Sequence, residues 1–363
     1  MQKILIAAYN LEIGGIEKSL INFINEMKND FDITLLLEEK KGTLLYKVPL
    51  DVKIIEYTPE NDSNLIKRKV KNLIKRIKFF IKYKNKFDCA ISFATYSKVS
   101  SYVARTASKN SILWGHADYL SLYNNEKNEV IKFFKELNFN KFKKIVFVSQ
   151  EGKNSFLNIF PKTKLKITAC NNFIDDKEII EKAKEEISLK KENVFTFLNV
   201  GRHDERQKRL TRLIEAANKL KMEKYNFKIL FVGDGQNTSD YKRTVQENNL
   251  TDVITFIGKK ENPYPYFHIS DCVILTSEYE GYPVVFLESF LLKKPIITTK
   301  VSDYQGIQDK YGYVTEKNTE SIYEAMKKII ENGFEIKERF DPDEYNEKIK
   351  SKIIKIIKED GND

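Results

Sequence analysis

The feature that most constrains the fold is a regular alternation of short apolar strands with helical segments along the chain. Parallel strands need a crossover between them, usually a helix, so this alternation predicts parallel sheets with helices on both faces. Strands are predicted over residues 3–9, 32–39, 52–57, 88–94, 111–117 and 145–150, and then over 195–202, 227–235, 253–258, 271–277, 295–300 and 312–315. The pattern predicts an α/β protein made of two doubly wound, Rossmann-like halves.

The alternation lapses in a charged stretch between the two halves. We predict an N-terminal domain over 1–172, a linker region over 173–193 and a C-terminal domain over 194–341, followed by a last helix over 342–360. Sheets of this kind bind ligands at the carboxyl ends of their strands. If the two domains face each other, these ends border an interdomain cleft.

Composition excludes several other classes of protein. No apolar run reaches the roughly 18 residues of a membrane span, and the N-terminus is strand-like rather than a signal peptide. Cys89, Cys170 and Cys272 are far apart and lie in apolar surroundings, which indicates buried free thiols in a reducing compartment. With only three His, a structural zinc site is not expected. We expect a cytoplasmic protein, with peripheral attachment to the inner face of the cell membrane left open.

The formal net charge of +10 favours a negatively charged partner, and the charge is concentrated at 64–86. This segment holds ten Lys or Arg and no acid, with apolar residues at helical spacing. One interpretation is a helix that packs its apolar stripe on a sheet. The other is a basic amphipathic helix that lies on an anionic membrane surface. Nucleic acid is not an expected partner, because no helix-turn-helix, zinc finger or aromatic RNA-binding pattern is present.

Two segments at predicted strand ends have the chemistry of anion sites. Gly14 and Gly15 follow the first strand and precede a helix, so backbone N–H groups there can approach a phosphate, although a simple turn also explains them. In the second half, Arg202 ends a strand and Lys208 follows six residues later. These two cations can neutralise a phosphate, and ordinary surface charge is the alternative.

A third segment, from 271 to 290, places two carboxylates around a strand-to-helix turn. Glu280 falls in the loop and Glu288 in the second turn of a helix that begins near Pro283. The N–H groups of Val284 and Val285 at the start of this helix can hold a diphosphate. Carboxylates would repel it, so we expect them to accept hydrogen bonds from hydroxyls on either side. This predicts a nucleotide diphosphate sugar as ligand. No Asp-x-Asp pair suggests a metal, and neither metal nor cofactor is expected.

Four segments together resemble the family 4 retaining glycosyltransferases of GT-B fold, over essentially the whole chain. They are GGIEKSL at 14–20, NVGRHDERQKRLTRLIEA at 199–216, FVGDGQ at 231–236 and SEYEGYPVVFLES at 277–289, the last matching that family's E-x7-E motif. The resemblance also implies that the last helix crosses back to the first domain.

The resemblance implies a role for each matched residue. Arg202 and Lys208 would contact the diphosphate, Glu280 the transferred sugar, Glu288 the ribose and the loop at Gly258 the base. His116 in WGHAD would lie near the reacting centre, and Asn172 matches an interdomain position, although Phe173 after it departs from the pattern. The whole predicted donor-binding set is Gly14, Gly15, Arg202, Lys208, Gly258, Glu280, Gly281, Tyr282, Pro283, Val284, Val285 and Glu288. The expected catalytic residues are His116, Glu280, Arg202 and Lys208. His203 and His268 are expected to be incidental.

The implied activity is metal-independent, retaining transfer of a hexose-type sugar from a nucleotide diphosphate sugar, by family habit a UDP-sugar. The acceptor would be a hydroxyl of a glycan or of a polyprenyl-linked molecule in bacterial cell-surface polysaccharide synthesis (capsule, exopolysaccharide or teichoic acid). Two alternatives stay open at this point. One is a nucleotide-sugar epimerase of the same fold, since fold does not determine function. The other is a non-catalytic membrane-binding protein that uses 64–86.

Overall fold

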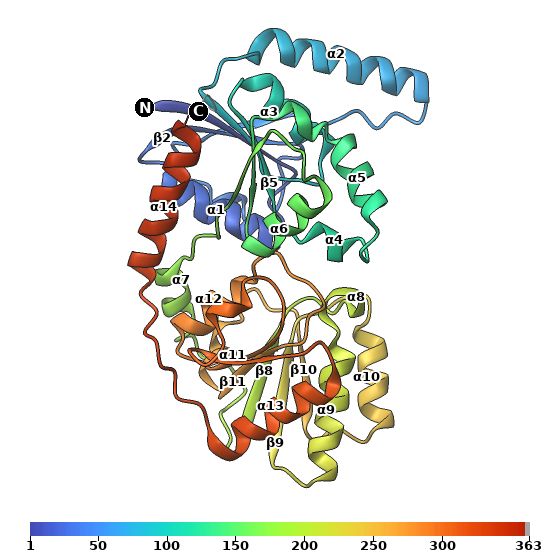
Figure 1. The fold of residues 1–363 in the computed structure, drawn as a ribbon, viewed down its shortest axis with the longest axis vertical. Coiled ribbons are helices and arrows are strands. Elements are labelled where there is room, and N and C mark those ends of the chain that lie inside the picture. The colour runs from blue at the N-terminus through green and yellow to red at the C-terminus, as the bar shows by residue number, and fades with distance from the viewer. Residues whose placement is uncertain (360–363) are drawn as a thin grey trace. The chain divides into compact units, whose positions relative to one another are not determined.

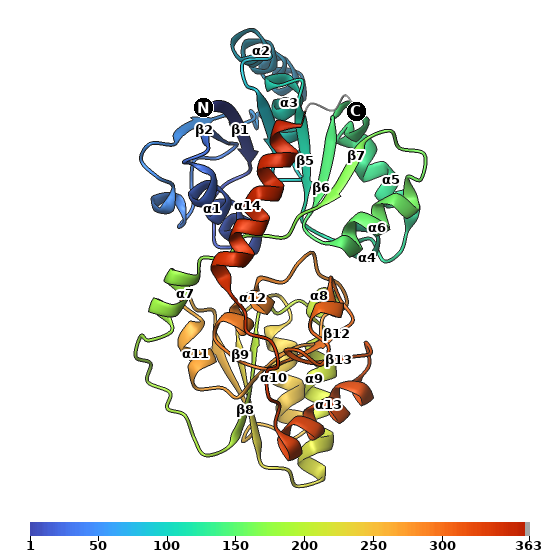
Figure 2. The same cartoon turned by 60° about the vertical axis from the view of Figure 1, so that its left-hand side comes forward.

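The computed structural model describes residues 1–359 and divides into two compact units. The first comprises Met1–Phe173 and the C-terminal segment from Asn346, and the second comprises Ile174–Tyr345. Figures 1 and 2 show each unit as a sheet with helices on both faces. Residue 360, the last of the predicted C-terminal helix, lies outside the described residues.

The first unit is built on a seven-stranded parallel sheet in the order β3-β2-β1-β4-β5-β6-β7. Strand β1 is buried from Ile4 to Ala8, as expected of a central strand covered on both faces. The strands are β1 (Gln2–Ala8), β2 (Phe31–Leu37), β3 (Lys53–Glu56), β4 (Cys89–Ser92), β5 (Ser111–Gly115), β6 (Lys144–Phe147) and β7 (Lys166–Ala169). The helices are α1 (Gly15–Met27), α2 (Leu65–Tyr83), α3 (Lys98–Ala107), α4 (Tyr119–Leu122), α5 (Lys127–Glu136) and α6 (Gln150–Ile159), with part of α14 (Pro342–Lys358).

The second unit is built on a six-stranded parallel sheet in the order β10-β9-β8-β11-β12-β13. Two apolar clusters pack around it, one including Phe197 and Phe231 and the other including Leu198 and Phe267. The strands are β8 (Phe195–Val200), β9 (Phe227–Val232), β10 (Ile254–Gly258), β11 (Cys272–Leu275), β12 (Ile296–Thr299) and β13 (Gly312–Thr315). The helices are α7 (Asp176–Lys182), α8 (Glu205–Lys208), α9 (Leu210–Met222), α10 (Thr238–Glu247), α11 (Tyr264–His268), α12 (Val284–Leu291) and α13 (Thr319–Asn332).

The strand order confirms the prediction of two doubly wound, Rossmann-like halves. In each sheet the chain first adds strands on one side and then reverses to add them on the other. The reversal lies between β1 and β4 in the first unit and between β8 and β11 in the second. Ligands of such sheets bind outside the carboxyl ends of the strands at this point. A ligand is therefore expected at the loops that follow β8 and β11.

The segment predicted as a linker, 173–193, contains helix α7, which is shorter than the charged stretch suggests. Ile174 and Ile179 are buried in the core of the second unit, so part of this segment is a packed element of that unit. Helix α14 joins the first unit from Asn346 onward. There the backbone carbonyl of Ile356 accepts a hydrogen bond from Nζ of Lys144 at 2.5 Å.

Helix α2, which is the predicted basic helix at 64–86, contradicts one of the two interpretations of that segment. Of its apolar residues only Phe79 is buried, while the stripe from Ile66 to Ile81 faces away from the unit. The interpretation in which this stripe packs on the sheet is therefore wrong. No helix in the described part of the chain is both long enough and apolar enough to cross a bilayer. The three cysteines are buried and free, as predicted.

Candidate functional site

A largely buried ion pair joins the two loops at the strand-order reversal of the second unit. Nζ of Lys208, at the end of α8, lies 2.6 Å from Oε1 of Glu280, in the loop between β11 and α12. The two side chains are 16% and 8% exposed, so water screens the pair only weakly. The hydroxyl of Ser277 also donates to Oε1 of Glu280, at 2.7 Å. These two contacts fix the orientation of the Glu280 carboxylate.

Gln207 connects this pair to Arg202. Its Nε2 donates to Oε2 of Glu280 at 3.2 Å, and its Oε1 accepts from Nη2 of Arg202 at 3.2 Å. Arg202 itself is exposed. One amide side chain therefore links the guanidinium at the end of β8 to the carboxylate that Lys208 contacts. The structure brings together three predicted residues, Arg202, Lys208 and Glu280, in one hydrogen-bonded network.

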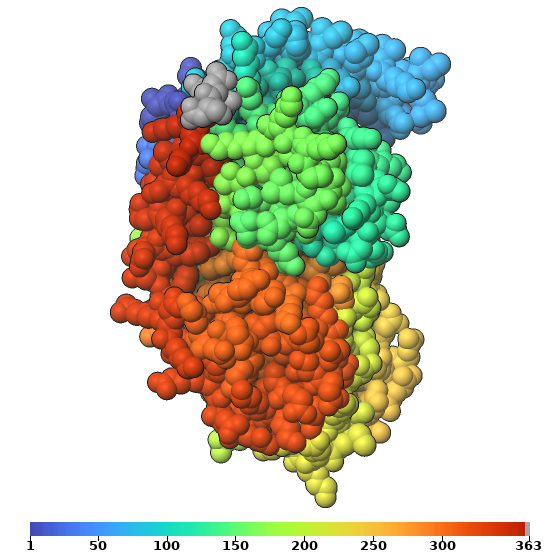
Figure 3. All heavy atoms as spheres, in the orientation of Figure 1, coloured from blue at the N-terminus to red at the C-terminus, as the bar shows by residue number. Residues whose placement is uncertain are grey.

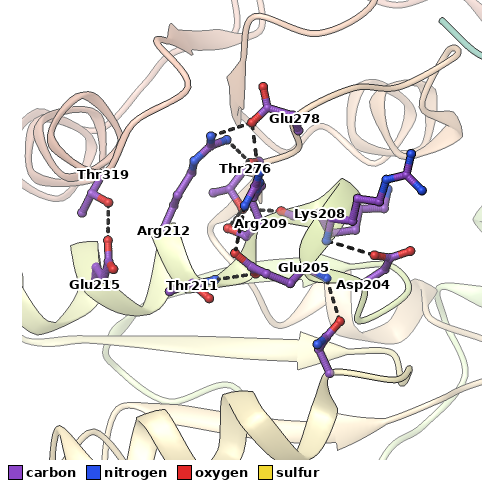
Figure 4. A network of polar contacts seen from close by, with 12 residues as sticks. Asp204, Glu205, Lys208, Arg209, Thr211, Arg212, Glu215, Thr276, Glu278 and Thr319 are labelled. Carbon is purple, nitrogen blue, oxygen red and sulfur yellow. Dashed lines mark hydrogen bonds and ion pairs between the residues drawn. The ribbon is translucent and has the colours of Figure 1, made fainter. Parts of the chain in front are cut away.

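Backbone contacts hold the two loops in register beneath this network. The N–H of Glu278 donates to the carbonyl of Gln207 at 2.7 Å, and the hydroxyl of Thr276 donates to the carbonyl of Lys208 at 2.9 Å. Nη2 of Arg212, on α9, reaches Oε2 of Glu278 at 2.6 Å (Figure 4). Lys208 and Glu280 therefore lie on backbone that is fixed from both sides.

The local sequence explains why the chain turns so sharply at Lys208. Asp204 caps the short helix α8 by accepting from the N–H of Arg206 at 3.0 Å. Arg209 then adopts the left-handed conformation, with φ of 50°, which ends α8 and lets α9 begin at the next residue. The guanidinium of Arg209 lies between Glu205 and Glu278, as Figure 4 shows. These contacts stabilise a backbone conformation that is uncommon outside glycine.

Two glycines of the FVGDGQ segment allow a close approach to the Arg202 loop. A Cβ on Gly233 would lie 1.8 Å from the carbonyl oxygen of Gly201, and a Cβ on Gly235 would lie 2.4 Å from that of His203. The ring of His203 is fully buried, and its Nδ1 is 2.9 Å from the hydroxyl of Thr238. His203 therefore supports the loop from beneath, and burial lowers its pKa. His268, at the end of α11, is exposed.

The loop after Glu280 leads into the predicted anion-binding helix. The carbonyl of Gly281 accepts from the hydroxyl of Ser302 at 2.6 Å, and the ring of Tyr282 packs edge-on against Phe286. Pro283 is the N-cap of α12 rather than its first helical residue, so the helix begins at Val284 and Val285. The first N–H groups of a helix have no intrahelical partner, which makes this end suited to an anion. The donor-binding roles of these residues stay predictions.

Glu288 is almost fully buried within α12. Its Oε1 accepts a hydrogen bond from the hydroxyl of Tyr264, at the start of α11, at 3.1 Å. Burial and the adjacent Glu288 carboxylate together raise the pKa of Tyr264, which stays a donor at neutral pH. Gly258, predicted near the base, ends β10 with φ of +80°, a conformation that favours glycine.

The remaining predicted residues belong to the first unit. Gly14 is extended, with φ of −159°, and a Cβ on Gly15 would meet nothing within 4 Å. The backbone conformation therefore does not require glycine at either position. His116 follows β5, and its ring lies 4.5 Å from that of Phe93. Burial lowers the pKa of His116 to about 3, so the imidazole is neutral at physiological pH. Its Nε2 has no hydrogen-bond partner among residues 1–359 and is available to a hydroxyl.

Sequence reasoning missed three residues that contact the predicted side chains of the second unit. Gln207 precedes Lys208 directly, and this adjacency was the available signal. The contacts of Ser277 with Glu280 and of Tyr264 with Glu288 depend on the folded conformation of the backbone. No local sequence pattern therefore identifies these two residues. Within the described chain, no group of three or more His, Cys, Asp or Glu side chains is arranged to hold a metal ion.

Comparison with known proteins places this network in a family. Residues 180–349 match the family model described as glycosyl transferases group 1. This span contains Arg202, Lys208, Glu280 and Glu288. The second unit is therefore similar to the group 1 glycosyltransferases.

Two curated relatives come from Campylobacter jejuni. One is N-acetylgalactosamine-N,N'-diacetylbacillosaminyl-diphospho-undecaprenol 4-alpha-N-acetylgalactosaminyltransferase, 24% identical over 92% of this chain and 91% of its own length. The other is GalNAc-alpha-(1->4)-GalNAc-alpha-(1->3)-diNAcBac-PP-undecaprenol alpha-1,4-N-acetyl-D-galactosaminyltransferase, 23% identical over 85% of this chain and 82% of its own length. The chain is thus similar to both over most of its length.

A solved structure shows the same fold. HepE from Anabaena, crystallised in complex with UDP and glucose, superposes with a TM-score of 0.76 at 18% identity, over 98% of this chain and all of HepE. The likeness confirms the predicted GT-B fold.

Proposed function

We propose that this glycosyltransferase moves a hexose-type sugar from a UDP-sugar to a hydroxyl of a glycan or polyprenyl-linked acceptor, with retention of configuration and without a metal. The pathway is the synthesis of a bacterial cell-surface polysaccharide. The observation that carries the proposal is the 2.6 Å contact between Lys208 and Glu280, extended to Arg202 by Gln207. In this network, two cations that can bind a diphosphate lie beside a carboxylate that can accept hydrogen bonds from sugar hydroxyls.

Charge neutralisation is the main task that we assign to the second unit. In the transfer, the bond between the sugar C1 and the phosphate oxygen breaks, and the departing diphosphate takes the electron pair. Arg202, with its exposed guanidinium, and Lys208 stabilise the charge that develops there, and the first N–H groups of α12 assist. Fixed cations can supply this stabilisation in place of a metal ion, and Lys208 is fixed because Thr276 and Glu278 hold the backbone at Gln207 and Lys208.

Retention follows if the acceptor attacks on the face that the diphosphate leaves. The acceptor oxygen forms the new bond to C1, and its proton passes to the departing phosphate oxygen, so no enzyme nucleophile is required. Glu280 orients the sugar hydroxyls, and Glu288 binds the ribose. We assign His116 a positioning role toward the acceptor hydroxyl, because its neutral ring can exchange a hydrogen bond without adding charge.

The relatives support the choice of substrates. The names of both Campylobacter jejuni enzymes describe transfer of N-acetylgalactosamine to glycans on diphospho-undecaprenol. The HepE complex contains UDP and glucose. We therefore expect a UDP-linked hexose or N-acetylhexosamine as donor, and an acceptor that a membrane lipid carries.

The test is a transfer assay with UDP-N-acetylgalactosamine, UDP-glucose and UDP-galactose, each offered with undecaprenyl diphosphate-linked glycans in the presence of EDTA. We expect one donor to yield a product heavier by one sugar, with the α-configuration of the donor preserved in its NMR spectrum. A β-linked product would contradict retention. Conversion of the donor to its epimer, with the nucleotide still attached and no acceptor product, would favour the epimerase alternative.

A further inference from the structure

Helix α2 presents two different faces, and only one of them is used within the first unit. The inner face carries Asn72, Lys75, Phe79 and Tyr83, which are spaced by three or four residues. Phe79 is buried against Tyr57, and Nδ2 of Asn72 donates to the carbonyl of Glu60 at 3.1 Å. These contacts attach the helix to the unit.

The outer face is an exposed apolar stripe. Eight large apolar side chains of α2 are each 44–75% exposed, and they are Leu65, Ile66, Val70, Leu73, Ile74, Ile77, Phe80 and Ile81. Figures 1 and 2 show α2 on the outside of the first unit, and Figure 3 shows its light-blue surface standing out from that unit. Contiguous apolar surface of this kind is uncommon on a soluble monomer and marks an interaction surface.

The charges beside the stripe identify the partner. Lys67, Lys71, Lys78 and Lys82 each follow an apolar residue of the stripe by one position, which places them along its flank. Lys71 pairs with Asp62 at 3.1 Å. Lys67, Arg68, Lys69 and Lys78 have no ion pair with any residue from 1 to 359 and stay available for an external anion.

We propose that α2 docks on an anionic lipid bilayer, with its apolar stripe inserted at the headgroup level and its flanking lysines on the lipid phosphates. A helix with these two properties lies in the plane of the membrane interface. A second copy of the chain fits less well, because two such stripes brought together would set their lysines against each other. A nucleic acid would pair with the lysines but leave the apolar stripe in water.

This inference does not depend on the proposed transfer reaction, because vesicle binding requires neither donor nor acceptor. The test is sedimentation of the full chain with vesicles of phosphatidylcholine alone or mixed with phosphatidylglycerol. We expect binding to the mixed vesicles only, and weaker binding as salt is raised. Equal binding to both vesicle types, or no binding by folded protein, would overturn the proposal.

Two variants with matched controls locate the binding surface. Lys67→Gln/Lys78→Gln/Lys82→Gln removes three charges from α2, and Lys109→Gln/Lys127→Gln/Lys141→Gln removes three exposed charges elsewhere in the first unit. Leu73→Gln/Ile77→Gln interrupts the stripe, and Leu50→Gln/Met222→Gln changes two exposed apolar residues outside it. We expect each α2 variant to lose at least tenfold in vesicle partitioning (about 1.4 kcal/mol) and each control to bind like wild type.

The α2 side chains changed here are exposed, so circular dichroism and the melting temperature are expected to stay those of the wild type. An α2 variant that binds vesicles as well as its control would contradict the proposal. A wild-type dimer in solution that Leu73→Gln/Ile77→Gln dissociates would instead show that a second copy covers the stripe, and would also overturn it.

Discussion

Nζ of Lys208 and Oε1 of Glu280 lie 2.6 Å apart, although 72 residues separate them in the chain. The contact crosses the strand-order reversal of the second sheet, from the end of α8, which follows β8, to the loop that follows β11. It is nearly closed to solvent, so each charge depends on the other for its stability. The pair therefore links two loops of the fold and also lies at the centre of the proposed donor site.

Replacing Lys208 tests its role in the proposed donor site. Lys208→Met leaves Glu280 without its cation, and we expect transfer to fall by about 100-fold or more, as for the loss of one charge-stabilising donor. Steady-state kinetics with a UDP-sugar measures the change. The control is Lys219→Met, which removes an exposed ion pair with Glu320 on the same unit. Equal activity of the two variants would remove Lys208 from the mechanism.

Tyr264→Phe tests the support of Glu288 by removing a single buried hydroxyl. We expect UDP affinity to fall several-fold and the free energy of unfolding to fall by about 1 kcal/mol, because a buried acceptor loses a donor. Calorimetry and urea denaturation report the two changes. Tyr225→Phe, which removes a hydroxyl bonded to Glu331 at the surface, is the control and is expected to bind UDP like wild type. Unchanged UDP binding by Tyr264→Phe would show that this contact is structural only.

Gly233→Ala tests the close approach of two loops. The added methyl group would lie 1.8 Å from the carbonyl oxygen of Gly201, so that loop must move and carry Arg202 with it. We expect a loss of roughly 2 kcal/mol or more in stability together with a loss of transfer. Gly306→Ala adds a methyl group that meets nothing within 4 Å and is expected to leave the melting temperature unchanged. A variant at Gly233 as stable as this control would show that the loop adapts.

The buried imidazole of His116 makes stability depend on pH. Its folded pKa, about 3, is below the value of roughly 6.5 that an unfolded chain would show. Between these values the unfolded state binds more protons, so stability is full above about pH 6.5 and falls as the pH decreases toward 3. We expect His116→Asn to lose stability less steeply over this range than wild type, in thermal melts at a series of pH values. His268→Asn, at an exposed position, should match the wild-type slope.

Several elements of the fold were predictable because their signals are local. Strand β11 and the start of helix α12 were predicted within two residues of their observed positions, since an apolar run followed by Pro283 specifies both. Strand β7 and helices α5 and α13 were not predicted. Strand β7 begins with the exposed Lys166 and therefore lacks a clear apolar pattern. Helix α13 was not predicted, although its apolar residues recur at helical spacing.

The part of the site that consists of motif residues was predictable from the sequence. Arg202, Lys208 and Glu280 were identified from charge at strand ends, and their meeting follows from the parallel order of β8 and β11. The Tyr264–Glu288 contact was not predictable, because it depends on how α11 packs against α12. The outward orientation of the α2 stripe was not predictable either, since apolar periodicity identifies a face but not what covers it.

The central claim is that the second unit binds a nucleotide diphosphate, with Glu288 on its ribose, and titration calorimetry tests it most directly. UDP, GDP and dTDP are titrated into wild type, Glu288→Gln and Glu320→Gln, the last a change at a surface carboxylate. We predict micromolar binding of UDP by wild type and Glu320→Gln, weakened more than tenfold, about 1.4 kcal/mol, in Glu288→Gln. Absence of nucleotide binding by folded wild type, or equal affinity in all three proteins, would contradict the claim.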